Sequence, residues 1–330
     1  MNIYNILSGK SKRYILTASG IVIPSTEIEI ALPKQRFSKA MFRAWTTRPD
    51  MKNEITQDTG WFPNLIVDAG LDRLGSNAGF SAFHVGQGTT TPTVGDTALA
   101  NYRAGIIATQ GNITYVGGTP YVLRQTWTAQ FAVGAANGNL TEMGMASAAT
   151  TGNLWSRALI LDGLGSPTTI VVQPTEALNV AYTLELSVPT SDVNGSCNIT
   201  GSANHTTTTR PSNISSWASG SSLAGFRTAA NAASSIVVYP GTLGAITSTP
   251  SGGGTVSATS HTAATYSTGS YLRSLTLTWN QTAGNISGGS PIQSIVLGLG
   301  GFPYQSQFSP TIAKDNTKTL VINYTAGWSR

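Results

Sequence analysis

The residue types that carry out catalysis or hold metals are sparse in this chain and do not cluster. The three histidines are His84, His205 and His261, and no two have the H-x-x-x-H or H-E-x-x-H spacing that brings two imidazoles onto one metal ion. The single cysteine, Cys197, has no second thiol with which to form a disulfide or a metal cluster. The sequence therefore predicts neither a metal site nor an internal disulfide.

The carboxylates offer one candidate pair. Glycoside hydrolysis usually requires two carboxylates held roughly 5–10 Å apart, and Asp68 and Asp72 are spaced one helical turn apart, but the adjacent Arg73 is typical of a solvated helix face. No G-x-S-x-G elbow occurs, and the glycine-rich runs 252–254 and 298–301 lack the Lys and Ser/Thr of a phosphate-binding loop. We expect no catalytic residue and no cofactor; a polysaccharide depolymerase that uses Asp68 and Asp72 is the enzymatic alternative.

Aromatic side chains in predicted loops are candidates for contact with sugars. An aromatic ring in a loop can stack on a sugar ring, because it presents a flat apolar face to solvent. The alternative is that such residues anchor the core or an interface. The candidate glycan-contacting residues are Trp155, Trp217 and Tyr304.

The positive charge is concentrated at the N-terminus. Residues 1–60 hold nine basic and five acidic residues, whereas the other 270 residues hold ten basic and nine acidic ones. Nucleic-acid binding needs clustered Lys and Arg, so the neutral body is not expected to bind nucleic acid. We interpret the basic segment as an arm that docks on a neighbouring subunit through strand addition and ion pairs. Its candidate assembly contacts are Lys10, Lys12, Arg13, Lys34 and Arg36.

The composition favours an all-β fold. Charged residues make up 10% of the chain, against roughly 25% in ordinary soluble domains, and the long neutral tracts are rich in Thr, Val, Ile, Tyr and Gly, which suit strands and turns. No apolar run reaches the roughly 18 residues of a membrane-spanning helix, and the N-terminus lacks the pattern of a secretory signal. We expect no membrane insertion and no export by the general secretory pathway.

The residue patterns predict many strands and one short helix. Residues 178–188 alternate between apolar and polar side chains, which is typical of a strand with one face in solvent. Residues 64–75 form the best helix candidate, with Asn64 as the N-terminal cap and Gly75 as the C-terminal cap.

These patterns predict two antiparallel β-sandwich domains. We place a basic attachment arm at residues 1–60, sandwiches at 61–190 and 225–330, and a Ser/Thr/Asn-rich connecting segment at 191–224 that contains ordered strands and long loops. Residues 125–140 resemble residues 273–286, since each is an alternating strand followed by a Gly-Asn turn. Either an internal repeat or convergence of two sandwiches on similar turns explains this likeness.

Several segments together resemble tail-associated virion proteins of tailed bacteriophages, over most of residues 61–330. They are NLIVDAGLDRLG, FHVGQGTTTPTVGDTALA, GNLTEMGMASAATTGNLWSRALIL, LNVAYTLELSVPTSDVNGS and the closing LVINYTAGWSR. The resemblance implies a non-enzymatic virion structural protein, made in the host cytoplasm and located in the tail rather than the head.

The resemblance implies a homo-oligomeric tail fibre, tail-tip or appendage component that docks on other virion proteins through its N-terminal arm. Two alternatives stay open. One is a receptor-binding module that recognises a host surface glycan, and the other is a capsid decoration or head-fibre protein.

Overall fold

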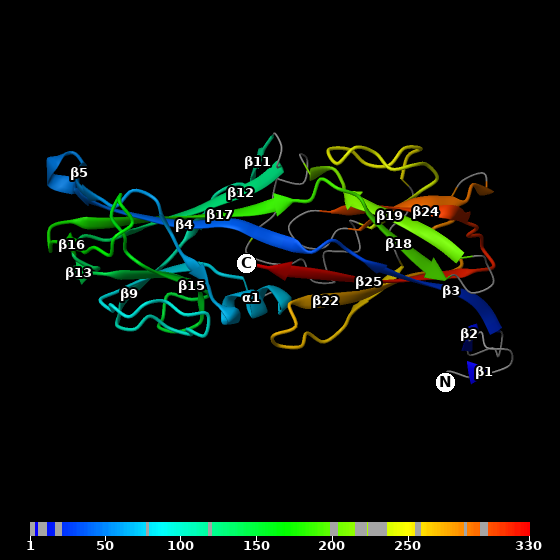
Figure 1. Cartoon of the computed structure of the whole chain (residues 1–330), viewed down its shortest axis with the longest axis horizontal. Coiled ribbons are helices and arrows are strands. Elements are labelled where there is room, and N and C mark those ends of the chain that lie inside the picture. The colour runs from blue at the N-terminus through cyan, green and yellow to red at the C-terminus, as the bar shows by residue number, and fades with distance from the viewer. Residues whose placement is uncertain are drawn as a thin grey trace.

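The computed structural model describes residues 4–5, 12–16, 22–76, 79–117, 121–198, 204–214, 223, 236–254, 259–286, 289–297 and 303–330. The molecule is elongated, with two β-rich lobes placed end to end (Figure 1). The strands between residues 35 and 188 form the first lobe, and the strands within residues 22–31 and 193–329 form the second. The described residues contain one α-helix, α1 (Asp68–Gly75), and one 3-10 turn, η1 (Pro49–Met51). The predicted all-β class with a single short helix is confirmed.

The first lobe is a sandwich of two sheets. The larger sheet is centred on three long strands, in the order β4 (Gln35–Arg48), β17 (Ala177–Val188) and β12 (Tyr121–Phe131). Shorter strands pair along β4 and β12, namely β5 (Glu54–Asp58), β6 (Phe62–Pro63), β10 (Thr109–Gln110) and β11 (Thr114–Val116). The facing sheet has the order β7 (Leu65–Ile66), β15 (Leu154–Leu159), β14 (Glu142–Ala146), β8 (Ala82–Gly86) and β9 (Tyr102–Ile107). A separate ladder joins β13 (Gly138–Leu140) to β16 (Ile170–Val172).

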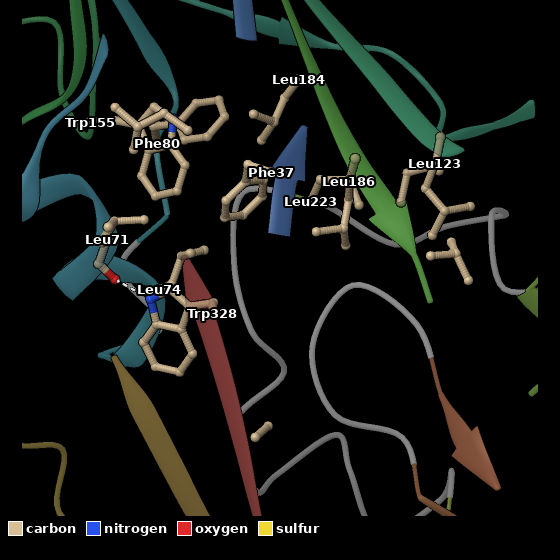
Figure 2. Packing of buried hydrophobic residues seen from close by; sticks show 14 of the residues in the cluster. Phe37, Leu71, Leu74, Phe80, Leu123, Trp155, Leu184, Leu186, Leu223 and Trp328 are labelled. Carbon is tan, nitrogen blue, oxygen red and sulfur yellow. Dashed lines mark hydrogen bonds between the residues drawn. The ribbon is translucent and has the colours of Figure 1, made fainter. Parts of the chain in front are cut away.

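Aromatic side chains fill the space between these two sheets. The ring centroids of Phe42 in β4 and Tyr182 in β17 are 5.0 Å apart. Phe80, which lies just before β8, packs 4.7 Å from Trp127 in β12 and 4.9 Å from Trp155 in β15 (Figure 2). The Trp155 Nε1 group donates a hydrogen bond to the Tyr182 hydroxyl at 3.0 Å, so the one polar atom of this buried indole is satisfied.

The second lobe also has two sheets. One contains β3 (Val22–Ala31), β25 (Thr319–Ser329), β22 (Leu272–Trp279) and β21 (Ser260–Ala263). It is extended beyond β3 by β2 (Lys12–Leu16) and β1 (Tyr4–Asn5). The other sheet has the order β18 (Val193–Asn198), β19 (Asn204–Pro211), β24 (Tyr304–Ile312), β23 (Ile292–Leu297) and β20 (Val237–Tyr239). The predicted connecting segment at 191–224 therefore contributes two strands, β18 and β19, to this lobe.

The segment formed by β3 and β4 passes through both lobes. β3 and β4 are separated by residues 32–34 only, and β25 lies beside both of them (Figure 1). Residues 319–325 of β25 pair in parallel with residues 25–31 of β3, and the end of β25 pairs in parallel with the start of β4. The sheets consequently show no break at residue 60, and residues 22–58 of the segment predicted as an arm lie within them. Docking of this segment on another virion protein stays a prediction.

The two lobes share an order of strand pairing. In the first lobe β12 pairs with β17 and the hairpin β14–β15 lies between them in the chain, and in the second β22 pairs with β25 with the hairpin β23–β24 between. In the first lobe, β8 pairs with β14 and β7 pairs with β15. In the second lobe, β20 pairs with β23 and β19 pairs with β24 in the same way. This order agrees with a repeated sandwich. One pairing differs, because β4 is antiparallel to β17 whereas β3 is parallel to β25.

The helix begins later than the sequence predicts. Asn64 is not its cap, because residues 65–66 form β7 and the N-cap position is Val67, which makes no side-chain cap hydrogen bond. Gly75 is the last helical residue rather than a left-handed cap. It is required for a different reason, because a Cβ at Gly75 would lie 2.3 Å from the Tyr266 ring. Pairing of residues 65–66 with β15 outweighs the capping preference of Asn64.

α1 joins the two lobes. Trp328 of β25 donates from Nε1 to the Leu71 carbonyl at 2.9 Å (Figure 2), and Arg273 of β22 donates to the Gly75 carbonyl at 2.8 Å. The carboxylate of Asp72 accepts a hydrogen bond from the Tyr266 hydroxyl at 2.5 Å. The second lobe therefore satisfies backbone carbonyls of a helix that belongs to the first.

Candidate functional site

Two of the segments that carry the resemblance meet in one buried ion network. Glu142 lies in β14 and Arg157 in the adjacent β15, and their side chains are 0% and 3% exposed. Arg157 donates from Nε to a Glu142 carboxylate oxygen at 2.9 Å and from Nη1 to Asp96 at 2.6 Å. Its Nη2 donates to the Thr90 carbonyl at 3.0 Å. One guanidinium thus joins two carboxylates and the backbone of the loop that follows β8.

This network anchors the loop of residues 87–101. The Glu142 carboxylate accepts backbone N–H groups of Gly88 at 2.9 Å, Ala100 at 3.1 Å and Asn101 at 2.8 Å. A Cβ at Gly88 would lie 2.4 Å from the Glu142 carboxylate, so the close approach requires glycine. The Glu142 carboxylate therefore binds both ends of the threonine- and proline-rich loop, and Arg157 binds its middle.

The charges of the network stabilise one another. Burial acts to lower the pKa of Arg157, but hydrogen bonds to Asp96 and Glu142 outweigh it and the pKa is raised. Burial likewise acts to raise the pKa of Asp96, but hydrogen bonds from Thr93 and Arg157 hold it below its usual value. Groups held in their charged forms and bonded to backbone amides suit loop anchoring better than proton transfer.

An open groove of about 320 Å³ lies on the outer face of the larger first-lobe sheet. Hydrogen bonds between strands order its floor, because the Thr126 and Thr183 hydroxyls lie 2.9 Å apart and Arg124 Nε donates to Glu185 Oε1 at 2.8 Å. Trp61, whose surface is 44% exposed, also lines the groove. We name it the outer groove; its lining residues are Lys39, Met41, Trp61, Arg124, Thr126, Thr183 and Glu185.

A short turn attached to β4 positions Trp61. Asp58 forms an ion pair with Arg43 of β4, with Nε and Oδ1 3.0 Å apart. The Thr59 backbone N–H and the Ala44 carbonyl lie 3.0 Å apart, and the Thr59 hydroxyl accepts the Ala44 N–H at 3.0 Å. Gly60 adopts φ +66°, a left-handed conformation that favours glycine. The turn holds the indole beside the outer face of the sheet.

Two polar groups of the outer groove have no protein partner in the part of the chain that is described. Nε and Nη2 of Arg124 both reach Oε1 of Glu185 at 2.8 Å, so Oε2 receives no hydrogen bond from a described residue. Glu185 is nevertheless only 8% exposed. Lys39 lies opposite Glu185 in the strand register and has no carboxylate within ion-pair distance among the described residues.

His84 is the titratable residue of β8. Its side chain is fully buried, and Nε2 lies 2.7 Å from the Ala148 carbonyl. The Tyr102 hydroxyl donates to the neighbouring Ala149 carbonyl at 2.6 Å, so the two rings together hold the β14–β15 loop. Burial lowers the pKa of His84, and the hydrogen bond to Ala148 opposes this effect only in part. His84 therefore packs within the first lobe and helps to hold this loop.

The pKa of His84 makes stability depend on pH. A lowered pKa in the folded state means that the unfolded state binds the proton more readily. We therefore expect the free energy of unfolding to fall from about pH 7.5 to about pH 5.5, by at most about 1.4 kcal/mol per pH unit. Urea unfolding at several pH values measures this slope. His84→Gln should flatten it and His261→Gln should not; an unchanged slope in His84→Gln would contradict the expectation.

The candidate glycan-contacting residues need correction. Trp155 lies in β15 and Tyr304 in β24, and both are fully buried rather than exposed in loops, so neither ring can stack on a sugar in this fold. The Tyr304 hydroxyl donates to the Pro33 carbonyl at 3.0 Å. Trp217 lies outside the described residues. Among the described tryptophans, the exposed one is Trp61, which follows the turn after Asp58.

The candidate assembly contacts are placed only in part. Lys34 and Arg36 are exposed where β3 gives way to β4. Lys12 and Arg13 belong to β2, and Lys10 lies outside the described residues. Their contact with another subunit stays a prediction.

The other candidate chemical groups have structural partners. Asp68 pairs with Arg330 at 2.5 Å, and Asp72 accepts bonds from the second lobe instead of forming a solvated helix face. His205 is buried against the Pro310 carbonyl. Within the described ranges, no group of three or more His, Cys, Asp or Glu residues is arranged to hold a metal ion, and no helix is long and apolar enough to cross a membrane.

A scan against protein-family models, a search of curated proteins and a search of solved structures each found no match to this chain.

Proposed function

We propose that this chain is a non-enzymatic structural protein of a tailed-bacteriophage particle. It would serve as a tail fibre, tail-tip or tail-appendage component and assemble as a homo-oligomer. The observation that carries the proposal is the buried network around Arg157. The residues through which the sequence resembles virion proteins are the same residues that hold one loop to the sandwich.

The use of the charged side chains supports a building block. The Glu142 carboxylate accepts hydrogen bonds from three backbone amides and one guanidinium. The Asp72 carboxylate accepts a hydrogen bond from the second lobe. These hydrogen bonds join segments that are far apart in the sequence, so both carboxylates make the fold more rigid.

The arrangement of the lobes also supports it. The segment formed by β3 and β4 crosses both lobes, and β25 lies beside it, so the two sandwiches are joined by strand pairing as well as by a linker. An elongated particle component benefits from such continuity. Leu164, at the tip of the tight turn after β15, is 93% exposed and offers an apolar contact to a neighbouring copy.

The mass of the purified chain in solution tests the assembly. We expect light scattering coupled to size-exclusion chromatography to give a multiple of the 34.4 kDa chain mass. The Leu164→Asp variant should shift the equilibrium towards smaller species, and Leu272→Asp in the second lobe serves as the control. A monomer at all concentrations would contradict the homo-oligomer.

Immunogold electron microscopy tests the location. Antibodies raised against the recombinant chain should label the tails of particles purified from cultures that produce it. Label on the head would favour the capsid-decoration alternative. Absence of the chain from purified particles, by mass spectrometry, would overturn the virion assignment.

A further inference from the structure

We propose that the outer groove binds the neutral sugar ring of a glycan. This inference rests on the groove alone and does not depend on the virion assignment. The ring would stack on Trp61, and its hydroxyls would bond to Glu185 and Lys39.

The first support is the aromatic surface. Trp61 is the one tryptophan among the described residues that exposes a large part of its surface, at 44%, and it does so beside a groove rather than on a convex edge. A pyranose ring has an apolar face of C–H groups, which packs on an indole, and a rim of hydroxyls. The turn of residues 58–60 holds Trp61 in place before any ligand binds, so little ordering cost remains.

The second support is the unfilled hydrogen-bonding capacity of the floor. Glu185 is 8% exposed, and both bonds from Arg124 reach Oε1, which leaves Oε2 without a donor among the described residues. Oε2 is not one of the buried atoms that lack a partner, so it faces solvent and can accept a hydrogen bond from a donor that enters the groove. Lys39, on the neighbouring strand, is exposed, and its ammonium can donate to a ligand oxygen.

These two groups together select the ligand class. A hydroxyl both donates and accepts, so neighbouring hydroxyls of one sugar can donate to Glu185 Oε2 and accept from Lys39. A carboxylate ligand would meet the unpaired oxygen of Glu185, and a cationic ligand would meet Lys39. A neutral polyol is the chemistry that satisfies both groups without an opposing charge. The groove volume of about 320 Å³ lies at the small end of ligand sites, at roughly 300–1,000 Å³, and suits the end of a glycan.

Titration of the intact chain with neutral oligosaccharides tests the proposal. The probes are oligosaccharides of glucose, galactose, mannose and N-acetylglucosamine, with oligogalacturonate as the acidic counterpart. Isothermal titration calorimetry gives the affinity, and saturation-transfer NMR shows which sugar protons contact the protein. We expect at least one neutral probe to bind saturably, and oligogalacturonate to bind more weakly than neutral oligogalactose.

Matched variants distinguish the groove from other surfaces. Trp61→Ala should weaken binding by about tenfold or more, whereas Trp61→Phe, which keeps a ring, should retain most of the affinity. Glu185→Gln keeps an acceptor for Arg124 but places an amide where Oε2 accepts, and it should also weaken binding. Glu54→Gln is the exposed control that should bind as the parent does.

Three results would overturn the proposal. They are the absence of saturable binding by every neutral probe, equal binding by the parent chain and Trp61→Ala, and tighter binding of oligogalacturonate than of its neutral counterpart. The oligomeric state and the particle labelling are measured separately, so either proposal can fail while the other stands.

Discussion

Replacing Arg157 by leucine should destabilise the protein by about 3–5 kcal/mol, because it leaves the carboxylate of Glu142 buried and uncompensated. Glu142 is fully buried and cannot turn to solvent, and Asp96 loses its partner at the same time. Chemical denaturation followed by circular dichroism measures the change. The loop of residues 87–101 should also become sensitive to proteolysis, since its anchor depends on the charge balance of the network.

A second substitution tests this explanation against simple loss of packing. Glu142→Gln in the Arg157→Leu background removes the buried charge but keeps an oxygen for the backbone amides, so it should recover part of the lost stability. Arg48→Leu is the control, because its pair with Asp50 is exposed, and the denaturation midpoint should hardly move. If Arg157→Leu behaved like Arg48→Leu, the network would not stabilise the fold as argued.

The local residue pattern was sufficient to predict one long strand, at residues 178–188. The alternation of residues 178–188 is present in β17, with Tyr182 and Leu184 on the inner face. The solvent-facing side, however, is nearly covered. Asn179 and Glu185 are each 8% exposed, because β17 is central and long side chains from β4 and β12 lie over it. The alternation indicates which face of the strand points inward. The position of the strand within the sheet decides how exposed the side chains of the other face are.

The candidate site depended on information that a single segment does not contain. Glu142 and Arg157 meet because β14 and β15 pair in one register, in which Arg157 lies opposite Gly144. Asp96 reaches them from a loop more than forty residues away in the chain. The sequence identified these segments by resemblance, yet it could not show that they share one buried network, since pairing register is a tertiary property.

The same limit explains the error over aromatic residues. Trp155 was predicted to lie in a loop, as a candidate for contact with a sugar ring. It lies instead on a central strand of the facing sheet, against Phe80 and Tyr182. Trp61 had the better local signal, because Asp58 and Gly60 precede it in a turn.

The second large effect is expected at the junction of the lobes. Trp328→Ala should destabilise the protein by about 3–5 kcal/mol, because it removes a fully buried indole and leaves a cavity. It also deprives the Leu71 carbonyl of a hydrogen bond and Tyr266 of a stacked ring at 5.8 Å. Trp328→Phe keeps a ring but lacks the N–H, so its cost should be smaller than that of Trp328→Ala and should include the loss of the hydrogen bond.

The control for this prediction is Trp61→Ala, which removes the same side chain from an exposed position and should change the free energy of unfolding by less than about 0.5 kcal/mol. Because residues of both lobes form one continuous buried cluster, we expect the parent chain to unfold in a single transition. In Trp328→Ala the whole transition should shift to lower denaturant. If only the signal of one lobe shifted, the lobes would be independent, and α1 would contact the second lobe without coupling the two.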